Sequence, residues 1–105
     1  MTKIDVVEHI FSELRSMGFV RHRHEFVRNW LGREESYIRV LRKKMRSPSV
    51  SVFRTCANKL IGYGEAFEKN PLTKVDDIGR QFRGLAYKCQ LFIDQEISDQ
   101  SASRP

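Results

Sequence analysis

The stretch from residue 24 to 46, HEFVRNWLGREESYIRVLRKKMR, constrains the fold of this chain more than any other. Gly32 interrupts it, and apolar residues recur at helical spacing on both sides of that glycine. Two helices that share one core require this arrangement. We therefore predict two short helices joined by a turn at Gly32. The residues that should face inward are Val27, Leu31, Ile38 and Leu41.

The second of these helices should have one packed and one free face. Steps of about 100° per residue place Ile38, Leu41 and Met45 on the same side, where they would pack against the first helix. The opposite side is polar and basic, so it is free to contact another molecule. The outward row consists of Ser36, Arg39 and Lys43.

The layout resembles the λ-repressor-like, xenobiotic-response-element type of helix-turn-helix domain over about the middle half of the chain. In that family a Leu-Gly turn, an isoleucine in the second helix and a Pro-Ser step into the fourth helix recur in this order. The resemblance implies a helix-turn-helix domain over residues 1–70 that binds double-stranded DNA, with its second motif helix in the major groove. Together with a final helix beyond residue 70, the chain should be all-α with five helices. The matching residues are Leu31-Gly32, Ile38 and Pro48-Ser49, followed by Asn58, Lys59 and Leu60.

The same resemblance assigns a role in DNA binding to the polar residues of the motif. Glu34 and Glu35 are expected at the start of the second helix, where the helix dipole stabilises a carboxylate by roughly 0.3–1 kcal/mol. Beside DNA they would repel phosphate, unless one accepts a hydrogen bond from a cytosine amino group. Ser36, Arg39 and Lys43 would face the groove. Tyr37 and Arg42 would lie at the margins of the groove, and the phosphates would be contacted by Arg33, Lys44 and Arg46.

The charge of the chain is concentrated in the motif. The net charge is +6, but residues 21–60 alone carry 11 basic and 3 acidic groups, a local charge of +8. Residues 1–20 carry 2 basic and 3 acidic groups, and residues 61–105 carry 6 basic and 7 acidic groups, so each of these segments has a charge of −1. Solubility alone does not need such a concentration, whereas a polyanion-binding face does. This pattern favours double-stranded DNA as the partner.

Two other functions remain open from the sequence. A protein-interaction module that keeps the helix-turn-helix fold without reading DNA, like an anti-activator, is favoured by Glu34, Glu35 and the outward position of Val40. RNA binding has little support, because aromatic residues that could stack on bases are not clustered. Trp30, beside the turn, is predicted to fill the core rather than to stack on a base.

Residues for catalysis or metal binding are few. His9, His22 and His24 lack the spacing of a metal site, and arginines flank the last two. Cys56 and Cys89 fall on apolar helical stripes without a CxxC pair, so we predict reduced core residues. We find no catalytic constellation and no Gly-rich phosphate loop, and we expect no enzyme activity, cofactor, metal or small-molecule substrate.

Two further helices are predicted around the motif. Thr2 can cap the first, which has one apolar face and stops at Gly18. The other follows Pro48 and is expected to end at the Gly62–Gly64 pair, with a break over residues 65–72. No apolar run of 18 residues and no charged-then-apolar leader occurs, so we expect no membrane span and a cytoplasmic location.

A final helix is predicted from a cap at Thr73 to residue 98, with a frayed tail over residues 99–105. Its apolar residues follow an a/d heptad pattern for about two and a half heptads. Repressors of bacterial or phage type, which the resemblance implies, bind two half-sites as dimers. We therefore expect residues 71–98 to form a homodimer, with the alternative that the stripe folds back over its own domain. The stripe comprises Val75, Ile78, Phe82, Leu85, Cys89 and Phe92.

Overall fold

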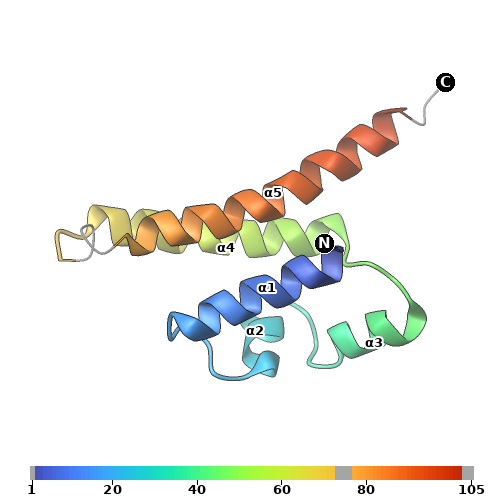
Figure 1. Ribbon diagram of the computed structural model, residues 1–105, viewed down its shortest axis with the longest axis horizontal. Coiled ribbons are helices and arrows are strands. Elements are labelled where there is room, and N and C mark those ends of the chain that lie inside the picture. Colours follow the sequence, from blue (N-terminus) through green and yellow to red (C-terminus); the bar gives the residue numbers. More distant parts are fainter. Residues whose placement is uncertain (1, 73–76, 103–105) are drawn as a thin grey trace.

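The computed structural model describes residues 2–72 and 77–102, which form five helices and no strand (Figure 1). The prediction of an all-α chain with five helices is confirmed. None of the described helices is long and apolar enough to cross a membrane. The helices are α1 (Lys3–Ser16), α2 (Arg23–Asn29), α3 (Tyr37–Lys44), α4 (Val50–Lys69) and α5 (Ile78–Ala102).

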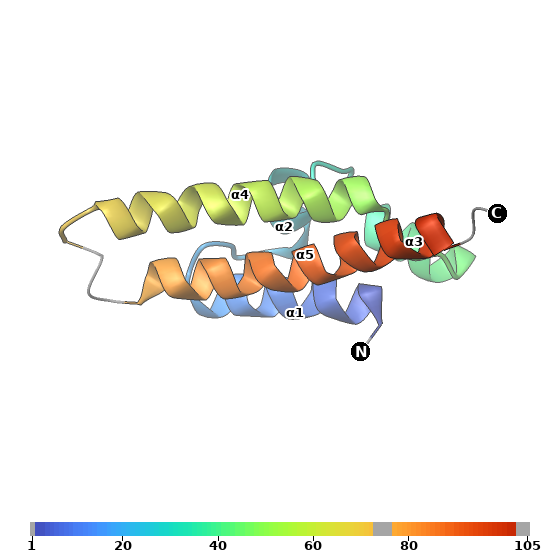
Figure 2. The same cartoon turned by 90° about the horizontal axis from the view of Figure 1, so that it is seen from above.

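The two longest helices, α4 and α5, lie side by side and antiparallel, with α1 along the other side of α5 (Figure 2). The short helices α2 and α3 lie on the far side of α1 from the free end of α5. The molecule is elongated, with extents of 51 × 32 × 21 Å. The three long helices therefore form the body of the fold, and α2 and α3 lie against one side of it.

Helix α1 begins at the predicted cap. The Thr2 hydroxyl accepts a hydrogen bond from the Asp5 backbone N–H (3.1 Å), and the Asp5 carboxylate accepts one from the Thr2 backbone N–H (3.0 Å). The hydrogen bond from the Thr2 backbone N–H to the carboxylate lowers the pKa of Asp5. Gly18, with φ of 84°, lies in the turn that follows the helix. The buried face consists of Val6, Val7, Ile10, Phe11 and Leu14.

The prediction that the fourth helix ends at its glycine pair is wrong, because α4 runs through Gly62 and Gly64 to Lys69. Gly64 is buried against α5, where a Cβ atom would lie 3.3 Å from the carbonyl oxygen of Gly79. A Cβ atom on Gly79 would in turn lie 3.0 Å from the carbonyl oxygen of Gly64. These two glycines thus allow the backbones of α4 and α5 to come close together.

The core is centred on Phe82 of α5, whose side chain is fully buried. Its ring centroid lies 4.9 Å from that of Phe19, 5.7 Å from those of Tyr63 and Phe67, and 6.1 Å from that of Trp30. Trp30 is buried in this cluster, which confirms its predicted role in the core. Rings from the turn after α1, from the end of α2 and from α4 therefore meet at one residue of α5.

The two cysteines also lie in the core, as predicted. Cys56 of α4 and Cys89 of α5 are buried free thiols. A hydrogen bond between the two thiols, together with burial, raises the pKa of Cys56 well above its usual value. A thiol held neutral in this way is a poor nucleophile, because the thiolate is the reactive form.

The C-terminal stripe is buried within the chain, so it is not an exposed dimer face as we had expected. Helices α1 and α4 cover it, and it follows the alternative arrangement, in which it folds back over its own domain. A homodimer through another surface stays a prediction. Of the stripe, Phe82, Leu85 and Cys89 are buried, and Ile78 and Phe92 are partly buried against the core.

Two expectations concern the two ends of α5. Thr73, its predicted cap, and Val75, the first residue of the stripe, lie outside the described residues. At the other end, α5 continues to Ala102, further than the predicted end at residue 98. Residues 103–105 of the expected frayed tail lie outside the described residues.

Replacement of Phe82 by alanine should destabilise the fold rather than disturb an association. We expect a loss of about 3–5 kcal/mol in the free energy of unfolding, because Phe→Ala in a core removes apolar contacts and leaves a cavity. Tyr87 lies on the same helix and is 64% exposed, so Tyr87→Ala should change the free energy of unfolding by less than about 0.5 kcal/mol. Urea denaturation of both variants measures the difference. Equal effects would contradict the packing described here.

The glycine contact predicts opposite effects for two substitutions in α5. Gly84→Ala meets no atom within 4 Å and should stabilise the protein by up to about 1 kcal/mol, through helix propensity. Gly79→Ala should destabilise the protein, because the new Cβ would press on the Gly64 carbonyl and lie 2.5 Å from Cγ of Glu68. The Glu68 side chain cannot easily move away, since Arg83 holds its carboxylate by hydrogen bonds of 2.6 and 2.8 Å. Thermal melts compare the two. A Gly79→Ala variant as stable as Gly84→Ala would argue against a close backbone contact.

Candidate functional site

The connection between α2 and α3 spans residues 30–36, longer than the turn of about three or four residues in a standard helix-turn-helix. Gly32 has φ of 67°, which confirms it as the turn glycine. Helix α3 begins only at Tyr37, so Glu34 and Glu35 precede it. The expectation that these carboxylates lie at the start of the helix is therefore wrong, because the loop takes up residues assigned to its first turn.

Helix α2 is held in place from α4. The ammonium group of Lys59 donates a hydrogen bond to the carbonyl oxygen of Asn29, the last residue of α2. The same group lies 5.5 Å from the centroid of the Trp30 ring. A cation is favoured at a helix C-terminus and over an indole ring, so Lys59 fixes the point from which the loop to α3 departs.

The register of α3 agrees with the sequence except at its end. Ile38 and Leu41 are buried, and Arg39 and Lys43 are exposed, as predicted. Met45 was expected to pack beside the two apolar residues, but it is 94% exposed. This expectation is wrong because α3 stops one residue earlier, at Lys44.

Met45 turns away from the core because the backbone at this point is left-handed, with φ of 54°. Its N–H donates to the carbonyl oxygen of Arg42 (3.2 Å), and the N–H of Arg46 donates to that of Leu41 (2.9 Å). These two bonds form a Schellman motif, in which glycine is the usual residue at the left-handed position. The fold thus keeps an exposed methionine where glycine would fit with less strain.

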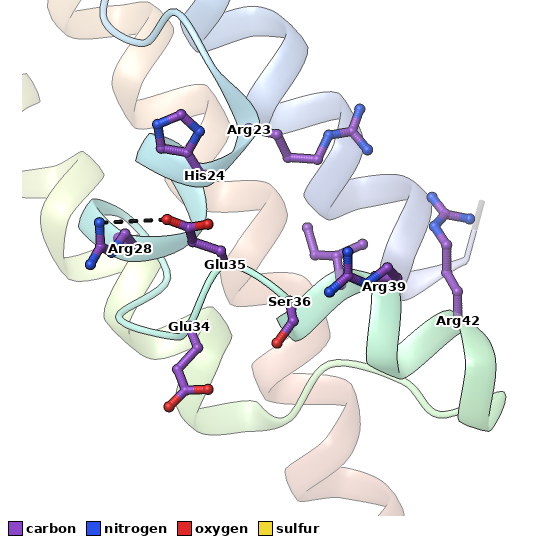
Figure 3. A pocket seen from close by; sticks show the side chains of 9 residues that line it. Arg23, His24, Arg28, Glu34, Glu35, Ser36, Arg39 and Arg42 are labelled. Atoms are coloured by element: carbon purple, nitrogen blue, oxygen red, sulfur yellow. Dashed lines mark ion pairs between the residues drawn. The ribbon is translucent and has the colours of Figure 1, made fainter.

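Between α2 and α3 lies a hollow of about 830 Å³, which we call the basic hollow. Figure 3 shows Arg23, His24 and Arg28 from α2 around one side and Arg39 and Arg42 from α3 around the other. Arg23, His24 and Arg28 were not among the site residues predicted from the sequence, although the excess of basic residues over 21–60 was a signal for them. The remaining lining of the basic hollow comes from Glu34, Glu35, Ser36 and Ile38.

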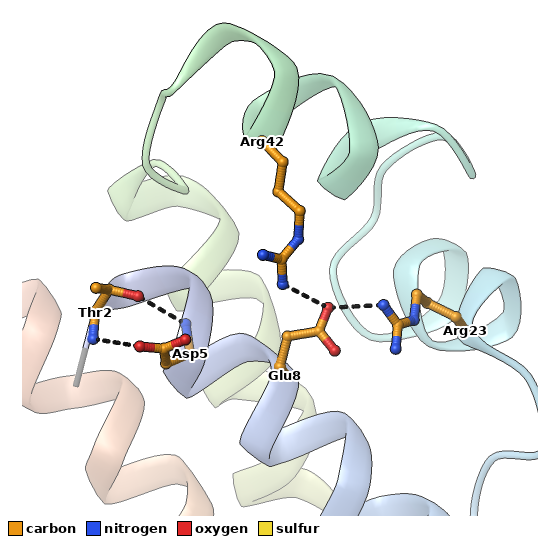
Figure 4. Close-up of polar contacts among 5 residues, drawn as sticks. All are labelled: Thr2, Asp5, Glu8, Arg23 and Arg42. Atoms are coloured by element: carbon orange, nitrogen blue, oxygen red, sulfur yellow. Dashed lines mark hydrogen bonds and ion pairs between the residues drawn. The ribbon is translucent and has the colours of Figure 1, made fainter.

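Acidic side chains partly neutralise three arginines of the basic hollow. Glu8 of α1 lies between Arg23 and Arg42, at 3.0 and 3.5 Å, and so connects α1 to both α2 and α3 (Figure 4). Arg28 pairs with Glu35 at 3.7 Å (Figure 3). These arginines are more than half exposed, so each pair adds little stability. Glu8 could not be found from the sequence, because only the fold brings it near the motif.

The other cations of α3 have no such partner. Arg39, Lys43, Lys44 and Arg46 are exposed and form no ion pair with any residue that the structure describes. They follow the outward face of α3 and the turn after it. Much of the uncompensated charge of the motif therefore lies on α3 and the turn that follows it.

A second hollow, of about 730 Å³, lies beside the loop and the other edge of α3, and we call it the loop hollow. Arg33 lines this hollow. Its guanidinium lies 5.7 Å from the centroid of the Tyr37 ring and donates a hydrogen bond to the Ser51 hydroxyl (2.8 Å). Val40 completes its apolar part. Tyr37 and Arg33, both predicted site residues, thus belong to this hollow.

The described part of the chain offers no arrangement for metal binding. Among residues 2–72 and 77–102, no group of three or more His, Cys, Asp or Glu side chains is placed to hold a metal ion. His22 and His24 stack on each other, with ring centroids 5.4 Å apart, and His9 lies 2.7 Å from the Lys88 ammonium. The three histidines therefore belong to two separate local contacts.

Residues 7–104 match the model of a Family of unknown function (DUF6626), and the chain belongs to this family. No curated protein and no solved structure matches the chain.

Replacement of Met45 by glycine should stabilise the protein by about 1 kcal/mol, because a left-handed conformation costs an L-residue with a side chain roughly that much. Lys44→Gly, one residue earlier and inside α3, should instead lower stability by about 1 kcal/mol. Urea denaturation of the two variants checks the sign of each change. A loss of stability in Met45→Gly would mean that the methionine side chain packs against the domain.

Proposed function

We propose that this chain binds double-stranded DNA through the outward face of α3 and acts as a small regulator of transcription. The observation that carries the proposal is the set of exposed cations on α3 to which the described residues offer no acidic partner. A helix of eight residues is about 12 Å long, comparable with the width of the major groove. Its size and charge therefore suit one stretch of groove and the phosphates on either side.

The residues divide into base-reading and backbone-contacting groups. Arg39 and Lys43, exposed on the outward face, are placed to reach base edges, where arginine reads guanine through O6 and N7. Lys44 and Arg46, nearer the end of the helix, would contact phosphate. Arg42 is tied to Glu8 and would orient α3 at the margin of the groove rather than read bases.

The regulatory part of the proposal rests on the sequence resemblance alone. A repressor of bacterial or phage type that binds as a homodimer, in the cytoplasm where bacterial DNA lies, is what that resemblance implies. A dimer would have to use a surface other than the C-terminal stripe, because α1 and α4 cover the stripe.

A second candidate function is the binding of an acidic protein segment. It is favoured by the exposed apolar side chains of Met45 and Val40, which stand beside the cations of α3. Glu34 and Glu35, in the loop before α3, would also be less unfavourable beside a protein than beside phosphate.

Fluorescence anisotropy with labelled DNA from immediately upstream of the gene tests the proposal. Affinity should fall steeply with salt, because phosphate contacts release counterions. Arg39→Ala should cost about 1–3 kcal/mol on the preferred sequence and relax the preference at one base pair. Arg46→Ala should weaken all sequences alike and reduce the salt slope by about one unit.

Arg80→Ala is the control, because it removes the same charge from an exposed position near the start of α5, away from α3. It should leave sequence preference unchanged. A wild-type protein without salt-dependent DNA binding at low ionic strength would overturn the proposal, and binding of an acidic peptide in its place would favour the second candidate.

A further inference from the structure

Val40 is an apolar residue on the outward face of a strongly basic helix. Helical steps place it about 40° from Ser36 and about 60° from Lys43 around α3, well away from buried Leu41. Its side chain is 38% exposed and contributes to the loop hollow. Solubility does not favour an apolar residue at such a position, and the cations around it point to contact with a charged partner.

The surroundings of Val40 suit a small apolar group at the edge of a polar ligand. Tyr37, one helical turn earlier, gives an aromatic side to the same hollow, and Gly32 also lines it. The rest of the lining is polar and consists of Arg28, Arg33, Glu34 and Ser36. The exposed part of one valine is too small for the centre of a protein interface, but it is enough to cover one methyl group.

The major groove presents such a group at a defined place. Among the groups that base pairs present there, the C5-methyl of thymine is the apolar one. A methylated cytosine carries a methyl group on the same ring atom and projects it into the same groove. A valine on the groove-facing side of a helix can cover that methyl while neighbouring cations contact the phosphates.

We propose that Val40, with Tyr37 beside it, receives the C5-methyl group of a pyrimidine in the major groove. The inference rests on the proposed DNA binding and adds to it a preference that the cations of α3 do not provide. Burial of one methyl group corresponds to about a fourfold gain in affinity.

The test uses four labelled duplexes that differ only in pyrimidine methylation: alternating adenine and thymine, the same with uracil for thymine, alternating guanine and cytosine, and the same with 5-methylcytosine. Wild-type protein should bind the thymine duplex about fourfold more tightly than the uracil duplex for each methyl in contact. An equal gain from 5-methylcytosine would identify the methyl group itself as the ligand. A gain from thymine alone would assign the site to thymine.

Substitutions connect the preference to the side chain. Val40→Ser should make the paired duplexes bind equally, and Val40→Ala, which favours the helix, should reduce the preference. Ile61→Ser is the matched control, because Ile61 is a β-branched residue with a similar exposure of 36% on α4. It should keep the wild-type preference, and circular dichroism establishes that each variant is folded.

Two results would overturn the inference while leaving DNA binding intact. The first is equal binding of all four duplexes by wild-type protein. The second is a preference that persists in both folded Val40 variants, which would assign it to the altered shape of the DNA. Failure to bind any duplex at low salt would overturn the inference together with the proposed function.

Discussion

The close antiparallel contact between α4 and α5 supports the rest of the fold, because α1 packs on this pair and Lys59 of α4 holds α2. Gly64 and Gly79 bring the two backbones together, and Phe82 of α5 packs beside this contact against the rings of Phe19 and Trp30. A short chain has little interior to share among its elements. One tight helix pair therefore supplies the buried surface that α2 and α3 cannot provide for themselves.

Because the long helices carry most of the core, α3 needs little burial of its own. Ile38 and Leu41 anchor one side of it, and the Glu8 contact with Arg42 ties it to α1. The opposite side can then hold a concentration of like charges that a self-supporting helix of eight residues would not tolerate in water. The exposed face of α3 is thus a consequence of stability provided elsewhere in the molecule.

Features on α3 that do not help folding gather at the same place. Met45 occupies a left-handed position that favours glycine, Val40 exposes an apolar side chain, and Arg39 and Lys43 have no acidic neighbour among the described residues. Strain and unpaired charge of this kind cluster where proteins meet their ligands. This convergence supports α3, rather than the pairing helices, as the surface on which the function depends.

Local information in the sequence was enough to determine the helical class, the capping of α1 by Thr2, the turn at Gly32 and the division of α3 into a buried row and an outward row. Each of these depends on residues within one or two turns of each other. The tertiary structure alone decided that Gly64 lets two helices meet instead of ending one, that Phe82 fills its own core instead of a partner's, and that Glu8 reaches Arg42. A glycine or an apolar stripe has the same local pattern in either role, and only the position of the segment that packs against it decides between them.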